Sequence, residues 1–549
     1  MIGRERCLSV RTTDTTKWVN VQESEVGVVY GVGCNMILDV ILVLDFGGQY
    51  CHLIARRIRQ SRVRSEIVPY SMTRDEIESL RTTCSIKGMI LSGGPDSVYK
   101  EGAPVCDAEI LAMDIPVLGI CYGHQLIAYL KGGSVSPGEK GEYGIATVDV
   151  KRPIGVLKGL GSKQKVWMSH GDMVHSLPYG FEVLASSENC PIAAFTNKER
   201  RIFGLQWHPE VTQTQSGKRM LRNFVFEVCG CRPNWRMSDF VKQAISEIRG
   251  AVGDSRCIIA LSGGVDSSTA ALLTQRAIGE NLTAVFVDHG FMRLGEPESV
   301  KGFFSGLKMD FSIVDSRERF LKRLEGVTDP EEKRIAIGEE FVHVFEEMAA
   351  KKGAEFLVQG TIYPDRIESG QGARADKIKS HHNVAGLPTK LRFRGVVEPL
   401  RDLYKDEVRE VAEKLGLPWE IVQRQPFPGP GLAVRVMGEV TREKIDLLRQ
   451  ADRIVAEEIE KEGLDDALWQ YFAVLLDTMT TGVRGDSRAY GYVVAIRAVE
   501  SREAMTASFA RIPFEVLGKI STRITNELPN VVRVVYDITN KPPSTIEWE

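Results

Sequence analysis

Short apolar runs in this sequence repeatedly end in a glycine-containing turn and lead into a helical segment. Early in the chain these runs span residues 41–44, 88–92, 116–120, 148–150 and 202–206, and the pattern returns at residues 257–261, 282–287 and 356–359. Helical segments follow two of the runs, at residues 124–130 and 267–277. Strands that alternate with helices predict α/β sheets whose faces are covered by the connecting helices.

The chain has 549 residues, which is too long for one hydrophobic core. Gly230, Pro233 and Asn234 interrupt the pattern once, and the run Pro-Phe-Pro-Gly-Pro-Gly at 426–431 interrupts it again. Beyond it, helices and late strands at 492–497 and 531–536 indicate an α+β unit. We therefore expect an N-terminal extension of unknown role, followed by three domains, at residues 1–36, 37–231, 238–428 and 429–549.

Composition excludes several classes of function. Hydrophobic residues make up 43% and charged residues 26%, with a net charge of −3, so no overall field attracts nucleic acid or an anionic membrane. No apolar run reaches the roughly 20 residues of a membrane span, and the N-terminal segment lacks a signal-peptide pattern. Ten scattered cysteines without C-x-x-C spacing favour a reduced, cytoplasmic protein.

A cysteine stands at the end of one apolar run. Cys121 lies in the sequence Gly-Ile-Cys-Tyr-Gly-His-Gln at 119–125, where flanking glycines permit a sharp strand-to-helix turn that exposes the nucleophile. The start of a helix also favours thiolate over thiol. The run Gln-Trp-His-Pro-Glu at 206–210 supplies His208 as a base. Residues two apart in an extended segment project on the same side, so Glu210 can orient that imidazole.

These motifs together resemble the class I glutamine amidotransferase domain. The resemblance covers residues 37–229 and implies Cys121 as nucleophile, His208 as base and Glu210 as its orienting residue. It also implies N–H donors to the oxyanion. Gly93 and Gly94, which follow the apolar run at 88–92, suit this role because no side chain obstructs their N–H groups. These donors are the backbone amides of Gly94 and Tyr122. The implied glutamine pocket is lined by Gln125 and the segment 169–172, with Ser169, His170 and Gly171. His124 varies from the residue most usual at its place.

A phosphate-binding loop follows the apolar run at 257–261. Ser262-Gly263-Gly264-Val265-Asp266-Ser267-Ser268 offers backbone N–H groups and hydroxyls at a helix start, where anions bind well. The lysine of the G-x-x-x-x-G-K-[ST] pattern is missing. The loop instead resembles that of N-type ATP pyrophosphatases, in the adenine-nucleotide α-hydrolase-like fold. These enzymes attack the α-phosphate of ATP, and Asp266 is placed to help hold Mg²⁺ beside the leaving pyrophosphate.

Longer motifs narrow the resemblance to the glutamine-hydrolysing GMP synthetases, over residues 37–549. They lie at residues 287–293, 359–369, 378–384, 398–409 and 426–435, and in the C-terminal sequence Lys-Pro-Pro-Ser-Thr-Ile-Glu-Trp-Glu. The resemblance implies that ammonia from glutamine aminates XMP to GMP through an adenylyl intermediate, with ATP and Mg²⁺. It also implies a homodimer formed by the C-terminal domain. The XMP contacts it implies are Arg334, Gln470, Asp486, Arg488, Lys541, Ile546 and Glu547.

Three alternatives remain open. A glutamine-dependent NAD synthetase shares the adenylating loop, although its glutaminase commonly belongs to another class. A non-catalytic nucleotide sensor would require decayed sites, whereas both motifs here are intact. The pair His381 and His382 could hold a metal, but adjacent residues of a regular strand cannot both face one ion. We expect that segment, with Lys379 and Arg401, to form a lid over the adenylyl intermediate.

Overall fold

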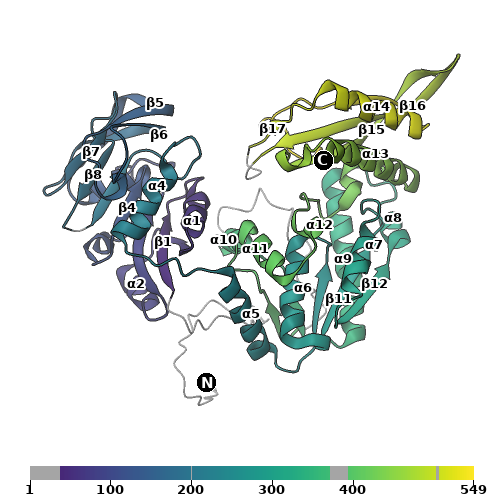
Figure 1. Ribbon diagram of the computed structural model, residues 1–549, viewed down its shortest axis with the longest axis horizontal. Coiled ribbons are helices and arrows are strands. Elements are labelled where there is room, and N and C mark those ends of the chain that lie inside the picture. The colour runs from purple at the N-terminus through teal and green to yellow at the C-terminus, as the bar shows by residue number, and fades with distance from the viewer. Residues whose placement is uncertain (1–37, 200, 371–392, 502–505) are drawn as a thin grey trace, which may run out of the picture.

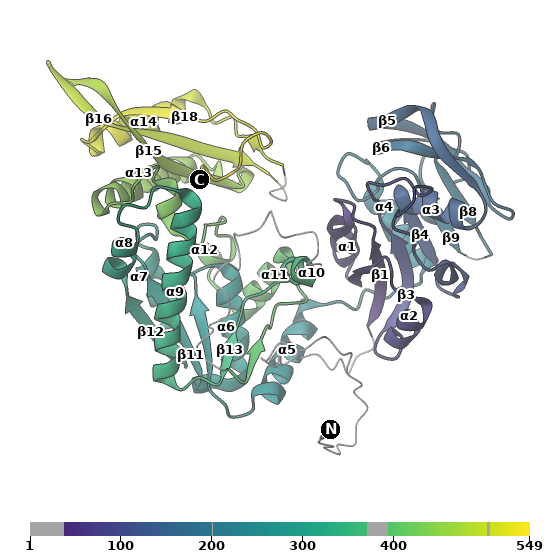
Figure 2. The same ribbon diagram turned by 180° about the vertical axis from the view of Figure 1, so that it is seen from behind.

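The computed structural model describes residues 38–199, 201–370, 393–501 and 506–549. The expected extension at 1–36 and the His-His-Asn part of the expected lid, with Lys379, lie outside the described residues. Figures 1 and 2 show the first α/β unit standing beside the second, while the C-terminal unit lies above the second. The expected fold class, three units built on α/β and α+β patterns, is confirmed.

The first unit is a nine-stranded sheet with the order β2-β1-β3-β4-β9-β8-β7-β5-β6. Its first five strands run parallel and the rest antiparallel. The strands are β1 Asp39–Asp45, β2 Arg64–Pro69, β3 Ser85–Leu91, β4 Val117–Ile120, β5 Ser134–Val150, β6 Lys163–Ser176, β7 Glu182–Ser186, β8 Ala194–Asn197 and β9 Ile202–Leu205. The helices are α1 Cys51–Arg59, α2 Arg74–Leu80, α3 Tyr122–Leu130 and α4 Gly217–Arg222.

The second unit is an all-parallel, five-stranded sheet with the order β12-β11-β10-β13-β14. Helices cover both faces, which is why its central strands are continuous apolar runs. The strands are β10 Cys257–Leu261, β11 Leu282–Asp288, β12 Asp310–Asp315, β13 Phe356–Val358 and β14 Gly395–Val397. The helices are α5 Met237–Val252, α6 Val265–Ile278, α7 Glu296–Phe304, α8 Arg317–Arg323, α9 Pro330–Lys352, α10 Tyr363–Gly370, α11 Lys405–Leu415 and α12 Trp419–Val422.

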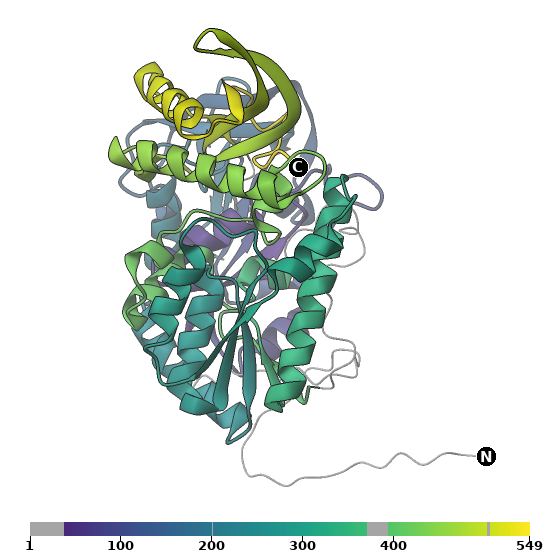
Figure 3. The ribbon, with the colours of Figure 1, turned by 90° about the vertical axis from the view of Figure 1, so that its right-hand side faces the viewer.

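The third unit packs two helices against a largely antiparallel sheet, as Figure 3 shows from the side. Its elements are α13 Arg442–Lys461, β15 Gln470–Arg484, β16 Ser487–Glu500, β17 Ser508–Phe509, α14 Phe514–Glu527 and β18 Val531–Tyr536. One apolar core runs from β11 and α9 of the second unit through residues 432–436 into α13 and β15. The Pro-Gly run at 426–431 therefore separates elements of secondary structure without separating their cores.

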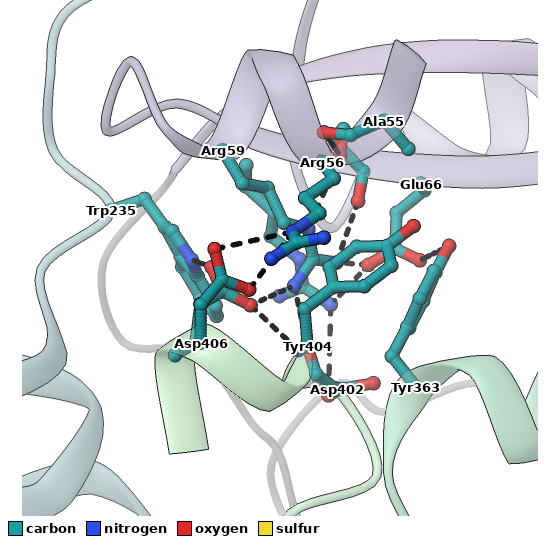
Figure 4. Close-up of polar contacts among 12 residues, drawn as sticks. Ala55, Arg56, Arg59, Glu66, Trp235, Tyr363, Asp402, Tyr404 and Asp406 are labelled. Atoms are coloured by element: carbon teal, nitrogen blue, oxygen red, sulfur yellow. Dashed lines mark hydrogen bonds and ion pairs between the residues drawn. The ribbon is translucent and has the colours of Figure 1, made fainter. Parts of the chain in front are cut away.

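The first two units meet around a buried arginine. The Arg59 guanidinium of α1 lies 4.6 Å from the ring centroid of Tyr363, 5.2 Å from that of Tyr404 and 5.3 Å from that of Trp235 (Figure 4). It donates 3.1 Å to a Glu407 carboxylate oxygen and also bonds the carbonyl of Asp402. Charge pairing and ring stacking thus hold α1 against the start of α11.

None of the described helices combines the length and apolar character needed to cross a membrane.

Candidate active sites

Cys121 sits on a strained turn between β4 and α3. Its backbone has φ 52° and ψ −104°, values that a non-glycine residue adopts only when its surroundings impose them. The surroundings are tight: a Cβ on Gly123 would lie 2.3 Å from the Leu91 carbonyl oxygen, and one on Gly119 would lie 2.4 Å from that of Gly123. The Cys121 N–H donates 2.8 Å to the Leu205 carbonyl. The two glycines therefore let three strand ends close around the thiol.

The expected base and its orienting residue are in contact. His208 Nδ1 lies 2.6 Å from Glu210 Oε1, and both side chains are buried. Burial alone would lower the pKa of His208, but the charge of Glu210 and the hydrogen-bonded sulfur of Cys121 outweigh it and raise the pKa well above its usual value. The imidazole is thus held ready to keep a proton taken from the thiol.

The two expected oxyanion donors adjoin one another. A Cβ placed on Gly94 would lie 3.2 Å from Cγ of Tyr122 and 2.9 Å from the Phe46 carbonyl oxygen, so only glycine fits this approach. Within the described residues, neither the Gly94 nor the Tyr122 backbone N–H has a backbone acceptor. Both donors are therefore available to a ligand beside Cys121.

The expected glutamine pocket lies on β6 and α3. The Ser169 carbonyl oxygen is 3.6 Å from Cys121 Sγ, and His170 is buried with Nδ1 2.9 Å from the carbonyl oxygen of Asp172. Gln125 Nε2 donates 2.8 Å to the same carbonyl. Gly171 follows on β6 in the same stretch. The sequence did not indicate Gln206 or Glu142, which extend this buried polar group.

The phosphate-binding loop joins β10 to α6 as expected. Gly263 has φ 72°, which allows the turn, and the Ser262 and Ser267 hydroxyls lie 3.0 Å apart. The Gly264 N–H donates 3.3 Å to the Ser262 hydroxyl. The first turn of α6 is formed by Val265, Asp266, Ser267 and Ser268. The loop therefore lies at the positive end of the helix, where an anion is stabilised.

Basic residues from other segments reach this loop. Lys405, the first residue of α11, pairs with Asp266 Oδ2, and Arg424 Nη1 donates 2.8 Å to the Gly263 carbonyl. Asp266 Oδ1 is buried and has no hydrogen-bond partner among the described residues. A carboxylate oxygen left in this way fits a Mg²⁺ ligand, since that ion prefers oxygen.

Part of the expected XMP set gathers beneath the C-terminal tail. Gln470 Nε2 donates 2.8 Å to Glu547 Oε1, and Arg435 donates to both oxygens of that carboxylate at 2.8 and 3.0 Å. Burial would raise the pKa of Glu547, but the Arg435 charge lowers it overall. Ile546 is buried beside Glu547. Arg435, which the sequence did not single out, thus fixes the centre of this group.

The remaining tail contacts bring in Arg334 and Lys541. Arg334 of α9 bonds the backbone carbonyl of Glu549, while Lys541 exchanges backbone hydrogen bonds of 2.8 and 3.0 Å with Ala507. Lys333, also unforeseen from the sequence, is buried and lies 2.6 Å from Glu549 Oε2. The tail is therefore held along its length, although chain ends commonly fray.

Asp486 and Arg488 are not brought to this group. They are exposed at the turn between β15 and β16, whereas Gln470 starts β15 at the opposite end of the hairpin. At about 3.3 Å a residue, the intervening strand separates them by roughly 50 Å. Figure 1 shows this hairpin projecting away from the C-terminus. Within one chain, the seven expected XMP residues thus fall into two distant sets.

Family comparisons divide the chain as its folds do. The family Glutamine amidotransferase class-I matches residues 42–228, NAD synthase matches residues 235–339, and GMP synthase C terminal domain matches residues 457–548. The NAD synthase match falls on the part that carries the phosphate-binding loop. The C-terminal match therefore favours the resemblance to GMP synthetases over the NAD synthetase alternative.

Relatives of nearly equal length decide the family. The glutamine-hydrolysing GMP synthase of Caldicellulosiruptor saccharolyticus is 54% identical over 93% of this chain and 99% of its own. The chain belongs to the glutamine-hydrolysing GMP synthases. The family member from Geobacillus kaustophilus is also 54% identical, over the same shares, and the one from Thermomicrobium roseum is 55% identical over 93% of this chain and 97% of its own. Membership sets aside the NAD synthetase alternative.

Proposed function

We propose that the chain converts XMP, ATP, glutamine and water into GMP, AMP, pyrophosphate and glutamate, with Cys121 as the nucleophile that releases ammonia. The observation that carries this proposal is the buried Cys121–His208–Glu210 arrangement on a strained turn. His208 accepts the thiol proton, and the sulfur attacks the amide carbon of glutamine. The N–H groups of Gly94 and Tyr122 donate hydrogen bonds to the negatively charged oxygen that forms from the amide carbonyl. Ammonia leaves with a proton from His208, and water then releases glutamate.

The second half-reaction is assigned to the loop 262–268. Its backbone N–H groups and hydroxyls suit the phosphates of ATP. Lys405 and Arg424 are near enough to stabilise the negative charge that develops on the departing pyrophosphate. Mg²⁺, held in part by Asp266, would screen the leaving group when bound. XMP oxygen attacks the α-phosphate, and ammonia then displaces AMP.

We further propose a cytoplasmic homodimer built on the C-terminal unit. The hairpin tip with Asp486 and Arg488 is exposed and distant from Glu547, so those two residues could meet an XMP site only across an interface between two chains. No disulfide joins the cysteines that the structure describes, which suits a reducing compartment. Sedimentation of the purified chain would give the oligomeric state directly.

The experiment that tests the two-site assignment separates the nitrogen donors. Cys121→Ala should abolish GMP formation from glutamine while leaving synthesis from free ammonia nearly unchanged, because the thiol acts only in ammonia release. Cys106→Ala, which removes another buried thiol of the same unit, is the matched control and should keep both activities. Loss of ammonia-dependent synthesis in a folded Cys121→Ala protein would disprove the assignment.

A further inference from the structure

A buried chain of polar groups connects the glutamine-pocket strand with the nucleophile. The Asp172 carbonyl oxygen of β6 lies 2.8 Å from Gln125 Nε2, which in turn lies 3.2 Å from Gln206 Oε1. Gln206 Nε2 lies 3.9 Å from Cys121 Sγ. The Gln206 side chain is fully buried, so its amide has no water to bond instead.

The direction of each hydrogen bond in this series of polar groups follows from the Asp172 carbonyl, where the series begins. A backbone carbonyl only accepts, so Gln125 must present its NH₂ group to Asp172. The second hydrogen of that NH₂ requires an acceptor, and Gln206 meets it with Oε1. The NH₂ group of Gln206 is then the end that faces Cys121. This orientation places an N–H donor against the sulfur.

The Asp172 carbonyl, at the end of this hydrogen-bonded series away from Cys121, is itself held by residues of the sheet. His170 also bonds the Asp172 carbonyl, through Nδ1 at 2.9 Å, and therefore carries a proton there. Its Nε2 lies 3.2 Å from Glu142 Oε2, and the Ser187 hydroxyl donates 2.7 Å to the other oxygen of Glu142. His170 and Glu142 face each other on β6 and β5, in the antiparallel half of the sheet. The carbonyl that orients both glutamines is thus fixed from the opposite side.

We propose that Gln206 donates a hydrogen bond to the Cys121 sulfur throughout the glutaminase reaction and ties the sulfur to the glutamine-pocket strand. The proposal rests on the proposed role of Cys121. His208 gives and takes a proton during turnover, whereas a carboxamide does not titrate, so its donor persists in every step. It stabilises the free thiolate before attack and again when hydrolysis of the thioester releases sulfur as the leaving group.

Alkylation of Cys121 by iodoacetamide across a range of pH tests this donor directly, since only the thiolate reacts. The Cys121 peptide is followed by mass spectrometry in the full chain. Gln206→Met keeps the length of the side chain and removes the donor. We expect the alkylation midpoint to move to higher pH by about 0.5–1 unit, as loss of one hydrogen bond of ordinary net strength predicts. Glutamine kcat should fall about 3- to 10-fold at pH 7 with little change in KM.

Two further variants keep the result unambiguous. Gln125→Met removes the group that orients Gln206 and should shift the alkylation midpoint in the same direction by a smaller amount. Gln215→Met changes an exposed glutamine in the loop after Glu210 and should shift nothing. Thermal unfolding of the first unit, unchanged in all three variants, shows that each protein is folded.

An unchanged alkylation midpoint in folded Gln206→Met protein would overturn the proposal, even if glutamine turnover fell. The alkylation profile does not depend on glutamine, so it also separates this proposal from the assigned function. A wild-type chain that alkylates at Cys121 but never hydrolyses glutamine would disprove the function alone. A midpoint shift in that case would still establish the donor.

Discussion

At the scale of single residues, burial without a charged partner makes His124 sensitive to acid. Its ring is enclosed in the first unit and stacked on Phe195 with centroids 4.5 Å apart. Burial disfavours the imidazolium and lowers the pKa of His124 to about 3. The folded protein therefore leaves the ring neutral under conditions in which the unfolded chain, with an ordinary value of about 6.5, binds a proton.

The sign of the pH effect follows. Only the unfolded state takes up the proton. The free energy of unfolding is therefore undiminished above about pH 6.5 and declines as the pH falls toward about 3. Between pH 7.5 and pH 5, His124 should cost the first unit about 2 kcal/mol. His124→Leu should remove that part of the decline, measured as the difference in unfolding free energy between variant and wild type at both pH values. Equal differences at the two pH values would contradict the assignment.

Residues named by motif were easier to predict than residues defined by contact. Cys121, His208 and Glu210 stand in short sequence patterns, and the structure brings them together. Gln206 also lies in such a pattern, but its sequence gives no sign of which way the side chain turns at a strand end. Arg435 and Lys333 became apparent only when the tail was seen to fold back on them. Such contacts span more than 100 residues and leave no local signature.

At the scale of elements, the strand-to-helix turn at Cys121 depends on backbone approach. A methyl group on Gly123 would meet the Leu91 carbonyl at 2.3 Å, and backbone cannot move aside as a flexible side chain can. Gly123→Ala should therefore displace α3 from β3 and cost about 1–3 kcal/mol, as overpacking typically does. Glutaminase activity should fall at least 100-fold, because a small misplacement of Cys121, the proposed nucleophile, has large effects.

Thermal unfolding and the two nitrogen donors check this expectation. Ammonia-dependent synthesis should survive in Gly123→Ala, since the altered turn lies in the first unit. Gly102→Ala offers a comparison, because a Cβ there meets nothing within 4 Å, although its φ of 79° carries some strain of its own. Normal glutamine turnover in Gly123→Ala would show that the turn tolerates the methyl group.

Apolar strands were predictable from sequence, whereas polar ones were not. The buried runs at 41–44, 116–120 and 257–261 all form strands close to the expected positions. β5 spans Ser134–Val150, yet only residues 148–150 showed a strand pattern, because much of its length is exposed and includes Pro137 and several glycines. Its pairing with β6 determines that strand, and pairing partners 14 to 42 residues away cannot be read from local periodicity.

At the scale of the whole molecule, Arg59 links the glutaminase unit to the adenylating unit. Its side chain is about 1% exposed, and Glu407 lies opposite at 3.1 Å. Arg59→Met would leave that carboxylate without its main partner, and breaking a buried pair of this kind costs about 3–5 kcal/mol. We expect the two units to unfold separately in the variant, with limited proteolysis at residues 229–237 at least 10-fold faster.

A double-mutant cycle measures whether the pair itself is responsible. Glu407→Gln should be destabilising alone, and the combination with Arg59→Met should cost less than the sum, with a coupling of about 0.5–3 kcal/mol. Arg62→Met, which breaks an exposed pair between the turn after α1 and Glu410 of α11, is the control and should change little. Additive costs at Arg59 and Glu407 would show that ring stacking, not charge pairing, holds the units.

The enclosure of Arg59 also decides where the chain can be shortened. Its three surrounding rings come from the segment after the first unit and from the second unit. The backbone N–H of Trp235 also donates 2.9 Å back to the Arg62 carbonyl. A glutaminase fragment that stops near residue 231 would expose a bare guanidinium, and the complementary fragment would expose tyrosine rings and acidic side chains to water. Fragments for separate expression should therefore keep Trp235 with the first unit, and their yield and solubility should improve accordingly.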